Sequence, residues 1–272
     1  LTGSGEARLR ILLLSYRFPW PRMRGDTLTV WKMAEYFGAR HELDLLCHPP
    51  ARPDDAERVR PLVRELFCVP FSRWRAALGV AAAVAGDLPF QVAWCASPAM
   101  RRLARHLVEE RGYDVVIPYY VRTAECVRDL RGPAKVAAMQ LSLSLQWARA
   151  AEQARSPLRR WLRRCESRRL GRYESRLFAD FDRCLLISPR DRDHIANHVP
   201  EKVFFNPHGV DTEAFSPDRR PAETDGKLVV FTGGMQFQPN VDAACHFARD
   251  LLPLVRRRVR DARFAIVGNR PT

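Results

Sequence analysis

Two glycine-bearing turns hold the residues best suited to bind a phosphate group. Gly25 follows an apolar run at 10–15, and Gly233 with Gly234 follows a second apolar run at 228–232. A small residue between a strand and a helix lets backbone N–H groups and the helix N-terminus approach a phosphate. We therefore predict that Gly25, Gly233 and Gly234 bind a diphosphate, although tight packing explains such glycines equally well.

Charged side chains flank the first of these glycines. Arg24 and Asp26 stand on either side of Gly25. They would either bind substrate or cap the helix that follows, and the sequence favours neither interpretation. Because open α/β sheets bind ligands at the carboxyl ends of their strands, we predict that Arg24 and Asp26 belong to a substrate cleft.

A further candidate stands where another apolar run ends. Residues 203–205 favour a short buried strand, and the turn formers after them stop it abruptly. His208 then offers the side chain of a general base beside Gly209. A hinge at the end of a strand is the simpler role, so we predict that His208 and Gly209 form a hinge.

The stretch after this hinge has the composition of a linker. Residues 211–226 are mostly polar and contain prolines, and an apolar run resumes at Leu228. We therefore predict a first domain over residues 1–210, a linker over residues 211–226 and the start of a second domain over residues 227–272.

The elements that would position these residues alternate regularly. Apolar runs predict strands at 10–15, 42–47, 66–70, 114–118, 134–139, 184–188 and 203–205. Helices are expected from about Thr27, after Asp54 and Asp55, after Ser97 and Pro98, near 121–130, over an arginine-rich stretch, and after Ser188 and Pro189. Strands that are apolar on both faces and separated by helices indicate a parallel sheet covered on both sides. The first domain is therefore predicted to be a doubly wound α/β domain.

The second half begins the same pattern and stops. A strand at 228–232, a helix from Pro239 to Val259 and a strand at 264–268 form one strand-helix-strand unit. A unit of this size cannot cover both faces of its own sheet. Either it extends the first sheet, or the chain ends inside a second domain.

Half of the net charge of +14 lies in one stretch. Residues 149–176 contain ten arginines and three glutamates. We expect one helix there, with a buried stripe formed by Leu158, Trp161, Leu162, Cys165, Tyr173 and Leu177. A solvated face explains the charge, as do an anionic bilayer surface, contacted by Arg159, Arg160, Arg163 and Arg164, and an acidic substrate. Nucleic acid is disfavoured because no recognition module has its signature here.

Composition indicates an ordinary soluble protein. Of the 272 residues, 46% are hydrophobic and 28% are charged. The longest uncharged apolar run, at 76–86, is much shorter than the ~20 residues that span a bilayer, and no signal peptide precedes the first strand. The seven cysteines are scattered without a CxxC motif, so we expect a reducing cytoplasm, no disulfide framework and no metal site.

Four stretches together resemble glycosyltransferase family 4. They are RILLLSYRFPWPRMRGD at the N-terminus, ESRRLGRYESRLFADFDRCLLIS at 166–188, NPHGVDTEAFSP at 206–217 and FTGGMQFQPNVDAACHFARDLLPLVRRRVRDARFAIVG at 231–268. Within the family the chain looks most like bacterial sugar transferases of exopolysaccharide systems associated with PEP-CTERM sorting. The resemblance implies a GT-B fold, in which a first Rossmann-like domain binds the acceptor and a second binds a UDP- or GDP-linked sugar donor. It implies no cofactor and no required metal.

The sequence departs from this family at several positions. The segment MQLSLSLQW at 139–147 lacks the histidine and the acidic residue expected near the transferred sugar, and Met235, Gln236 and Phe237 replace basic residues after the second glycine turn. The family's glutamate pair would lie beyond Thr272. Two pairs with its spacing, Glu57 with Glu65 and Glu166 with Glu174, fall in predicted helices of the first half and are taken as coincidental. The catalytic residues are therefore unassigned.

The resemblance implies a hexosyltransferase that acts on a saccharide or lipid-linked saccharide, in the cytoplasm or at the inner face of the cell membrane. With a donor domain only begun, the chain alone is expected to have weak or no activity. Two other classes stay open, namely a sugar-nucleotide epimerase of the same architecture and a non-catalytic binding protein.

Overall fold

The computed structural model describes residues 7–196, 200–216 and 226–268. Contacts between residues divide the chain into two compact units, Leu1–His208 and Gly209–Thr272. Most of the predicted linker, residues 217–225, lies outside the described residues.

The first unit is built on one parallel sheet of seven strands. The strands are β1 Arg10–Ser15, β2 Glu42–Cys47, β3 Glu65–Cys68, β4 Val115–Tyr119, β5 Ala134–Gln140, β6 Arg183–Leu186 and β7 Val203–Phe205. Their order across the sheet is β3-β2-β1-β4-β5-β6-β7, and every neighbouring pair is parallel. Because the chain proceeds from β1 to β2 on one side and reaches β4 on the other, the order reverses between β1 and β4.

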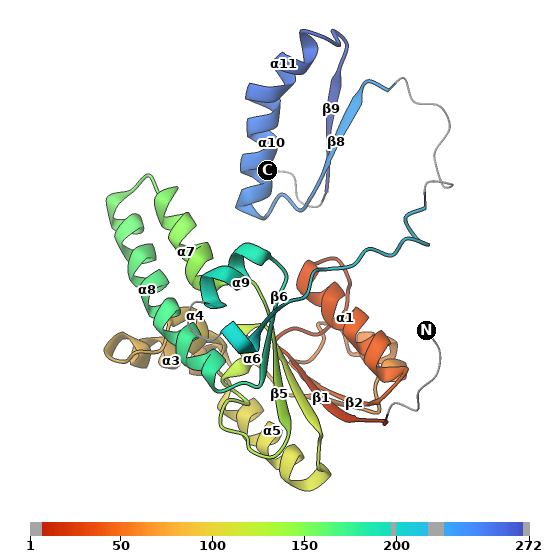
Figure 1. Ribbon diagram of the computed structural model, residues 1–272, viewed down its shortest axis with the longest axis vertical. Helices are drawn as coiled ribbons and strands as arrows, with labels where there is room; N and C mark the ends of the chain where they lie inside the picture. Colours follow the sequence, from red (N-terminus) through yellow and green to blue (C-terminus); the bar gives the residue numbers. More distant parts are fainter. Residues whose placement is uncertain (1–6, 197–199, 217–225, 269–272) are drawn as a thin grey trace. The chain divides into compact units, whose positions relative to one another are not determined.

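Both faces of this sheet are covered, which explains why its central strand β1 is apolar on both faces. Along β1, Leu12 and Leu14 belong to one core cluster, and Ile11 and Leu13 belong to the other. Successive side chains of a strand point to opposite faces. The prediction of a doubly wound α/β domain is therefore confirmed, and Figure 1 shows helix α1 on one side of the sheet and α5 on the other.

The helices of the first unit follow the strands in sequence. They are α1 Gly25–Gly38, α2 Ala56–Val59, α3 Arg73–Ala85, α4 Phe90–Cys95, α5 Pro98–Arg111, α6 Val121–Ala124, α7 Leu143–Glu152, α8 Pro157–Ala179 and α9 Pro189–Ala196. The Ser97 hydroxyl accepts a hydrogen bond from Met100 N and Pro98 begins α5, as the sequence predicts. None of these described helices is both long and apolar enough to cross a membrane.

Two shorter helical predictions hold only in part. A full helix near 121–130 is replaced by α6 and a series of three-residue turns, in which Cys126 N bonds Thr123 O and Leu130 N bonds Val127 O. Asp54 and Asp55 make no side-chain cap; residues 53–62 form short helical turns instead.

The arginine-rich stretch forms two helices rather than one. α7 ends at Glu152 and α8 begins at Pro157, whose missing N–H and fixed φ favour the first position of a new helix. α7 and α8 lie side by side in Figure 1, joined by a short turn.

The predicted buried stripe of α8 holds only in its second half. Tyr173 and Leu177 are buried, whereas Leu158, Trp161 and Leu162 are 65%, 61% and 49% exposed. The helical period places all of them on related faces, but only the second half of α8 packs on the core cluster of the sheet.

The second unit is a strand-helix-strand unit with a sheet of its own. β8 Leu228–Thr232 and β9 Arg263–Val267 pair in parallel. They form a separate two-stranded sheet and do not extend the first one. The predicted continuous helix is interrupted: α10 Gln238–His246 and α11 Leu252–Arg256 are separated by a widened π turn at Phe247–Leu251.

A proline explains this interruption. Pro253 has no N–H to donate to the preceding turn, and its ring crowds the carbonyl four residues earlier. Along this interrupted helix Ala244 and Leu252 are buried, while Ala248 and Leu251 are exposed. One helix on two strands can bury only part of an apolar face.

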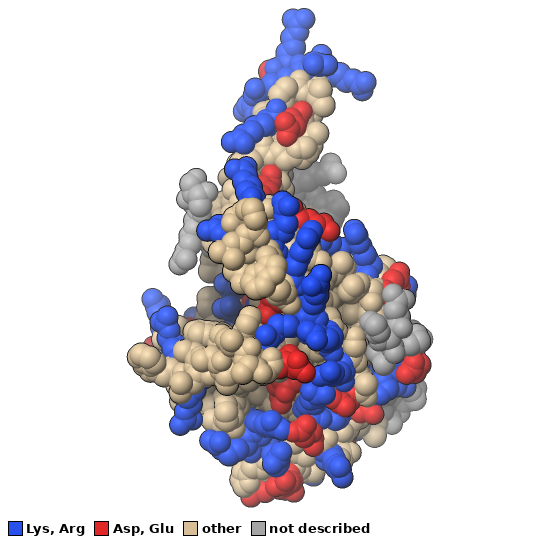
Figure 2. All heavy atoms as spheres, turned by 90° about the vertical axis from the view of Figure 1, so that its left-hand side faces the viewer, with Lys and Arg blue, Asp and Glu red and all other residues tan. Residues whose placement is uncertain are grey.

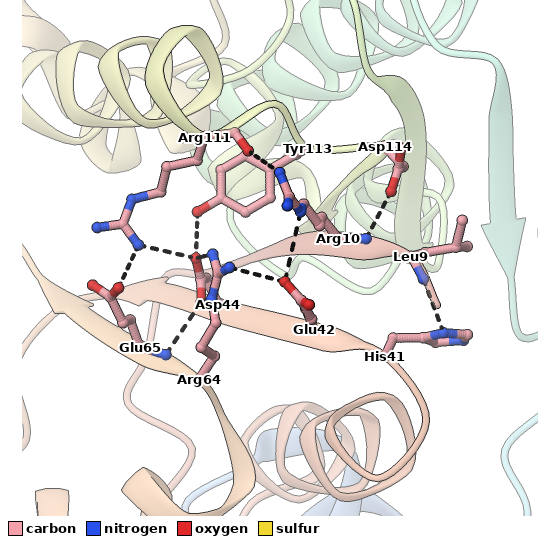
Figure 3. Close-up of polar contacts among 10 residues, drawn as sticks. All are labelled: Leu9, Arg10, His41, Glu42, Asp44, Arg64, Glu65, Arg111, Tyr113 and Asp114. Atoms are coloured by element: carbon pink, nitrogen blue, oxygen red, sulfur yellow. Dashed lines mark hydrogen bonds and ion pairs between the residues drawn. The ribbon is translucent and has the colours of Figure 1, made fainter. Parts of the chain in front are cut away.

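A polar network closes the amino-terminal edge of the main sheet (Figure 3). Asp44 is fully buried, and its carboxylate accepts hydrogen bonds from Arg64 Nε at 3.0 Å, from the Tyr113 hydroxyl at 2.6 Å and from Glu65 N at 3.2 Å. Arg111 Nη1 lies 3.6 Å from the same carboxylate. Because Arg64 and Tyr113 come from different segments, this network ties β2, β3 and the start of β4 together.

Candidate functional site

A small cavity lies at the carboxyl ends of β1 and β4, where the strand order reverses. Ligands of open α/β sheets bind at this switch point. The cavity measures about 150 Å³. It is lined by Ser15, Tyr16, Arg17, Arg24, Asp26, Tyr119, Tyr120 and Arg122.

Three arginines and one carboxylate line this cavity. Asp26 forms ion pairs with Arg17 Nε at 2.9 Å and Arg24 Nε at 3.3 Å, and its Oδ1 also accepts a hydrogen bond from Thr27 N. Arg122 lies over two aromatic rings, 4.9 Å from the Tyr120 centroid and 5.7 Å from the Tyr16 centroid. Among the described residues we find no carboxylate paired with Arg122. The cavity therefore has an excess of positive charge suited to an anionic ligand.

The tyrosines of the cavity stay protonated at neutral pH. Burial raises the pKa of Tyr16, Tyr119 and Tyr120 to about 12 each. A neutral phenol both donates and accepts hydrogen bonds. The positive charge of the cavity is therefore not offset by phenolate over the physiological range.

One residue of the cavity, Tyr120, has a strained backbone conformation, and Gln140 at the end of β5 has another. Tyr120 has φ of 69° and Gln140 has φ of 72°, and both residues follow or end neighbouring strands. Residues other than glycine rarely adopt positive φ, and such strain collects at functional sites. The Tyr120 backbone N–H donates to Ala138 O at 2.8 Å, which holds this conformation in place.

Neither Arg24 nor Asp26 makes a side-chain cap of α1, and their role toward a substrate stays a prediction. The two side chains line the cavity, and Asp26 also accepts a hydrogen bond in the first turn of α1. Sequence reasoning missed Arg17 and Arg122. Arg17 follows β1 and Arg122 follows β4, so the positions just after apolar runs carried the signal.

Gly25 is the first residue of α1 rather than part of the loop before it. A Cβ added there would meet no atom within 4 Å, and the residue does not adopt positive φ. Neither packing nor backbone conformation requires glycine in the described structure. Open space at a helix N-terminus leaves room for a phosphate to approach the backbone.

Substituting Gly25 with alanine tests whether the fold requires glycine at this position. We expect Gly25→Ala to leave the free energy of unfolding unchanged or to raise it by up to about 1 kcal/mol, because alanine loses less backbone entropy on folding. Urea unfolding followed by circular dichroism measures this change. A loss of stability above 1 kcal/mol would contradict the open environment of this residue.

The second glycine turn is closed by its own contacts. Gly233 N donates to Val267 O at 2.9 Å, and a Cβ on Gly233 would lie 2.7 Å from Asn240 Nδ2. Asn240 Nδ2 in turn donates to Gly234 O at 3.0 Å. Contact with the Asn240 side chain offers a packing reason for a small residue at Gly233, while the role of Gly233 and Gly234 toward a diphosphate stays a prediction.

The proposed hinge residues stand where the two units meet in the sequence. His208 ends the first unit and Gly209 begins the second. Both are exposed, and a Cβ on Gly209 would meet no atom within 4 Å.

A larger cavity, of about 320 Å³, lies among α7, α8 and α9. Its wall contains Ser144, Glu174 and His194 from these three helices. The Ser144 hydroxyl donates to Glu174 Oε2 at 2.6 Å and lies 3.2 Å from His194 Nε2. A hydroxyl, a carboxylate and an imidazole therefore lie together on one wall of this cavity.

The segment at 139–147 has no histidine or acidic side chain of its own, but Glu174 from α8 and His194 from α9 contact its Ser144. Glu174, taken from its spacing as coincidental, also accepts a hydrogen bond from Leu143 N at 2.6 Å, at the start of α7. Glu166 does the same for α4, accepting from Gln91 N at 3.1 Å. Both carboxylates occupy helix N-termini, where negative charge is stabilised. Glu57 and Glu65, by contrast, are exposed.

Glu174 predicts a pH dependence of stability. Burial raises the pKa of this carboxyl above its ordinary value, against the hydrogen bonds from Ser144, Leu143 and Ser142 that lower it. A raised folded-state pKa contributes stability that is present below the unfolded pKa of about 4.3 and is lost as pH rises through the folded pKa.

We therefore expect the stability of the wild type relative to a Glu174→Gln variant to fall as pH rises from about 4 toward 7. Urea unfolding at several pH values measures it, and Glu152→Gln, at an exposed position of α7, is the control. A difference between wild type and Glu174→Gln that rises with pH would show that hydrogen bonding outweighs burial.

The four arginines predicted to face a membrane divide into two groups. Arg160 donates to Ala154 O at 3.1 Å, in the turn before α8, and Arg163 donates to Ala150 O of α7 at 2.6 Å. Arg159 and Arg164 are exposed and make no polar contact with the residues that the structure describes.

Comparisons with known proteins place the fold. No family model matches the chain, and no curated protein sequence matches it. Among solved structures, a glycosyltransferase from Rickettsia africae is similar over 97% of this chain and 69% of its own, with a TM-score of 0.52 and 10% identity. Sucrose-phosphate synthase from Thermosynechococcus elongatus is similar over 97% of this chain and 71% of its own, with a TM-score of 0.56 and 15% identity.

At these identities the likeness concerns the fold. The chain has an α/β fold of GT-B type, with one complete doubly wound, Rossmann-like domain and the first strand-helix-strand unit of a second domain. The prediction of fold class is confirmed.

Proposed function

We propose that the protein is a glycosyltransferase, which moves a sugar from a nucleoside-diphosphate sugar to a hydroxyl of a saccharide acceptor. The observation that carries this proposal is the group of arginines that line the cavity at the switch point of a domain of GT-B type. The comparison proteins, a glycosyltransferase and a sucrose-phosphate synthase, support the same class.

In this reaction the bond between the anomeric carbon and the diphosphate oxygen breaks, and the diphosphate leaves with the electron pair. The acceptor oxygen bonds to the anomeric carbon and gives up its proton. Negative charge grows on the leaving group, so fixed cations and backbone amides aimed at it lower the barrier. We assign this role to Arg17, Arg122 and the open amide end of α1 at Gly25, with Arg24 and Asp26 at the substrate.

Finer assignments rest on the resemblance to glycosyltransferase family 4. We propose a UDP- or GDP-linked hexose as donor, and a lipid-linked saccharide of exopolysaccharide synthesis as acceptor, at the inner face of the cell membrane. Gly234 would contact the diphosphate from the second domain, and His208 with Gly209 would be the hinge. Transfer by this chain alone is expected to be weak or absent.

Calorimetric titration with UDP-glucose and with GDP-mannose tests the proposal. We expect one of these ligands to bind and, at about 100 times its dissociation constant, to stabilise the chain by about 2.7 kcal/mol. An epimerase would instead convert the donor without any acceptor, and a scaffold protein would bind neither ligand. Absence of binding, both by this chain and by a version extended at its carboxyl end, would refute the transferase.

A further inference from the structure

The first two turns of α8 expose apolar side chains among arginines. Leu158, Trp161 and Leu162 are 65%, 61% and 49% exposed. Arg159 and Arg164 stand beside them without a polar contact to the described residues. Monomeric soluble proteins rarely gather large apolar side chains on one exposed surface without a binding role.

A second helix, α3, exposes an apolar stripe of its own. Trp74 is 85% exposed and Leu78 is 69% exposed. Exposed alanines continue the stripe at three- and four-residue steps, at Ala77, Ala81, Ala82 and Ala85. Ala76 and Ala83 face the other way and are buried. The helix is therefore apolar on the side where an amphipathic surface helix is normally charged.

The two helices belong to one corner of the first unit. The Arg169 guanidinium, in the middle of α8, donates to Gly86 O at 2.7 Å and Leu88 O at 2.8 Å, and it also bonds Ala83 O near the end of α3. The same group lies 4.4 Å from the centroid of the Phe90 ring. Figure 2 shows this side of the molecule, where uncharged surface lies among many arginines and lysines.

Positive charge predominates on both apolar surfaces, with the exposed Asp87 and Glu152 at their borders. Residues 73–86 and 153–165 contain seven arginines and no aspartate or glutamate. The arginines are Arg73, Arg75, Arg155, Arg159, Arg160, Arg163 and Arg164. A partner for this surface must offer an apolar environment to the aliphatic and indole side chains and negative charge to the arginines beside them.

We propose that α3 and the first two turns of α8 dock the protein on an anionic lipid bilayer. Tryptophan and leucine enter the boundary between headgroups and acyl chains, and the arginines bind the lipid phosphates. A second copy of the chain would place seven arginines against seven, and a nucleic acid would offer nothing to the aliphatic stripe. The surface gives a lipid-linked acceptor a place to meet the enzyme, but docking itself does not depend on the proposed sugar transfer.

Co-sedimentation with vesicles of phosphatidylcholine and phosphatidylglycerol tests the proposal, with pure phosphatidylcholine vesicles for comparison. We expect binding to the anionic vesicles that weakens as salt rises. Each arginine near such a surface contributes about 1 kcal/mol, so Arg159→Ser with Arg164→Ser should lower the partition constant about 30-fold. Arg102→Ser with Arg105→Ser, which removes the same charge from exposed positions of α5, should change it less than about threefold.

The apolar side chains are tested in matched pairs. Because burial of a large apolar side chain contributes about 1.5–3 kcal/mol, Leu158→Ser with Trp161→Ser should weaken vesicle binding at least about tenfold, and so should Trp74→Ser with Leu78→Ser. All four are exposed, so the fold should persist, which circular dichroism verifies.

Three results would overturn the proposal: no binding to anionic vesicles, equal losses in the α5 control, or binding unchanged by both apolar pairs. Self-association that Trp161→Ser abolishes, seen by light scattering, would assign the surface to a second copy instead. Nucleotide-sugar titration without vesicles reports separately on the proposed transfer, so the two proposals fail independently.

Discussion

Replacing Asp44 with alanine is expected to lower the free energy of unfolding by about 3 kcal/mol, the lower end of the 3–5 kcal/mol range for breaking a buried ion pair. The lower end applies because the Arg64 side chain is 36% exposed and can regain water. Tyr113, 5% exposed, would lose the acceptor of its hydroxyl proton. Urea unfolding followed by far-ultraviolet circular dichroism measures the change.

A surface ion pair provides the control for Asp44. Glu57 pairs with Arg60 at 3.1 Å, and both side chains are more than half exposed. Glu57→Ala should therefore change stability by less than about 0.5 kcal/mol. If Asp44→Ala changed stability as little as Glu57→Ala, the network in Figure 3 would have no net effect on the fold.

The Asp44 network and the cavity that contains Arg122 lie at opposite edges of the same sheet. Asp44, Arg64 and Tyr113 hold the amino-terminal edge, where the carboxylate is saturated by donors. Arg122 stands at the carboxyl-terminal edge and stacks only on rings among the described residues. A charge whose partners are fixed stabilises the fold, whereas a charge with free hydrogen-bond donors can still bind a ligand.

The parallel sheet could be predicted from the sequence because its signal is local. A strand covered on both faces reads as an unbroken apolar run, and β1, β4 and β5 fall within one residue of their predicted bounds. The start of α8 carried a local signal as well. Ser156 and Pro157 repeat the Ser97–Pro98 pattern that correctly predicts α5, but the surrounding arginines favoured one continuous helix.

Exposure could not be predicted from periodicity. The spacing of Leu158, Trp161 and Tyr173 gives one stripe, but spacing does not say how far a neighbouring core extends along the helix. In the structure the core cluster ends near Leu170. The large apolar residues before it, Leu158, Trp161 and Leu162, are exposed. They form part of the proposed membrane-docking surface.

The second cavity was beyond sequence reasoning for a related reason. Ser144 lies 30 residues from Glu174 and 50 residues from His194 in the sequence. No local pattern joins them, because they meet only where α7, α8 and α9 pack together. Sequence spacing also misses a structural role of Glu174 and Glu166. The spacing of this pair was taken as coincidental for donor binding, yet both carboxylates accept hydrogen bonds from backbone N–H groups at the N-termini of neighbouring helices.

The cavity at the ends of β1 and β4 leads to the second large prediction, the loss of nucleotide-sugar affinity in an Arg122→Ala variant. A hydrogen bond to a charged group contributes about 1.5–3 kcal/mol, so the dissociation constant for the donor should rise about 10- to 150-fold. Because Arg122 has no ion-pair partner among the described residues, its removal should leave no buried charge uncompensated, and stability should change little. Calorimetric titration measures the affinity, and urea unfolding checks the fold.

Arg40 provides a matched control for Arg122. Its guanidinium also lies over a tyrosine ring, 4.1 Å from the Tyr36 centroid, but it follows the carboxyl end of α1 rather than the cavity at its start. Arg40→Ala removes the same charge and the same kind of stacking, so it should leave affinity within about twofold, as expected for an exposed charge screened by salt. Equal losses in both variants would indicate that overall charge attracts the donor, whereas a loss confined to Arg122→Ala would place the diphosphate at the switch point.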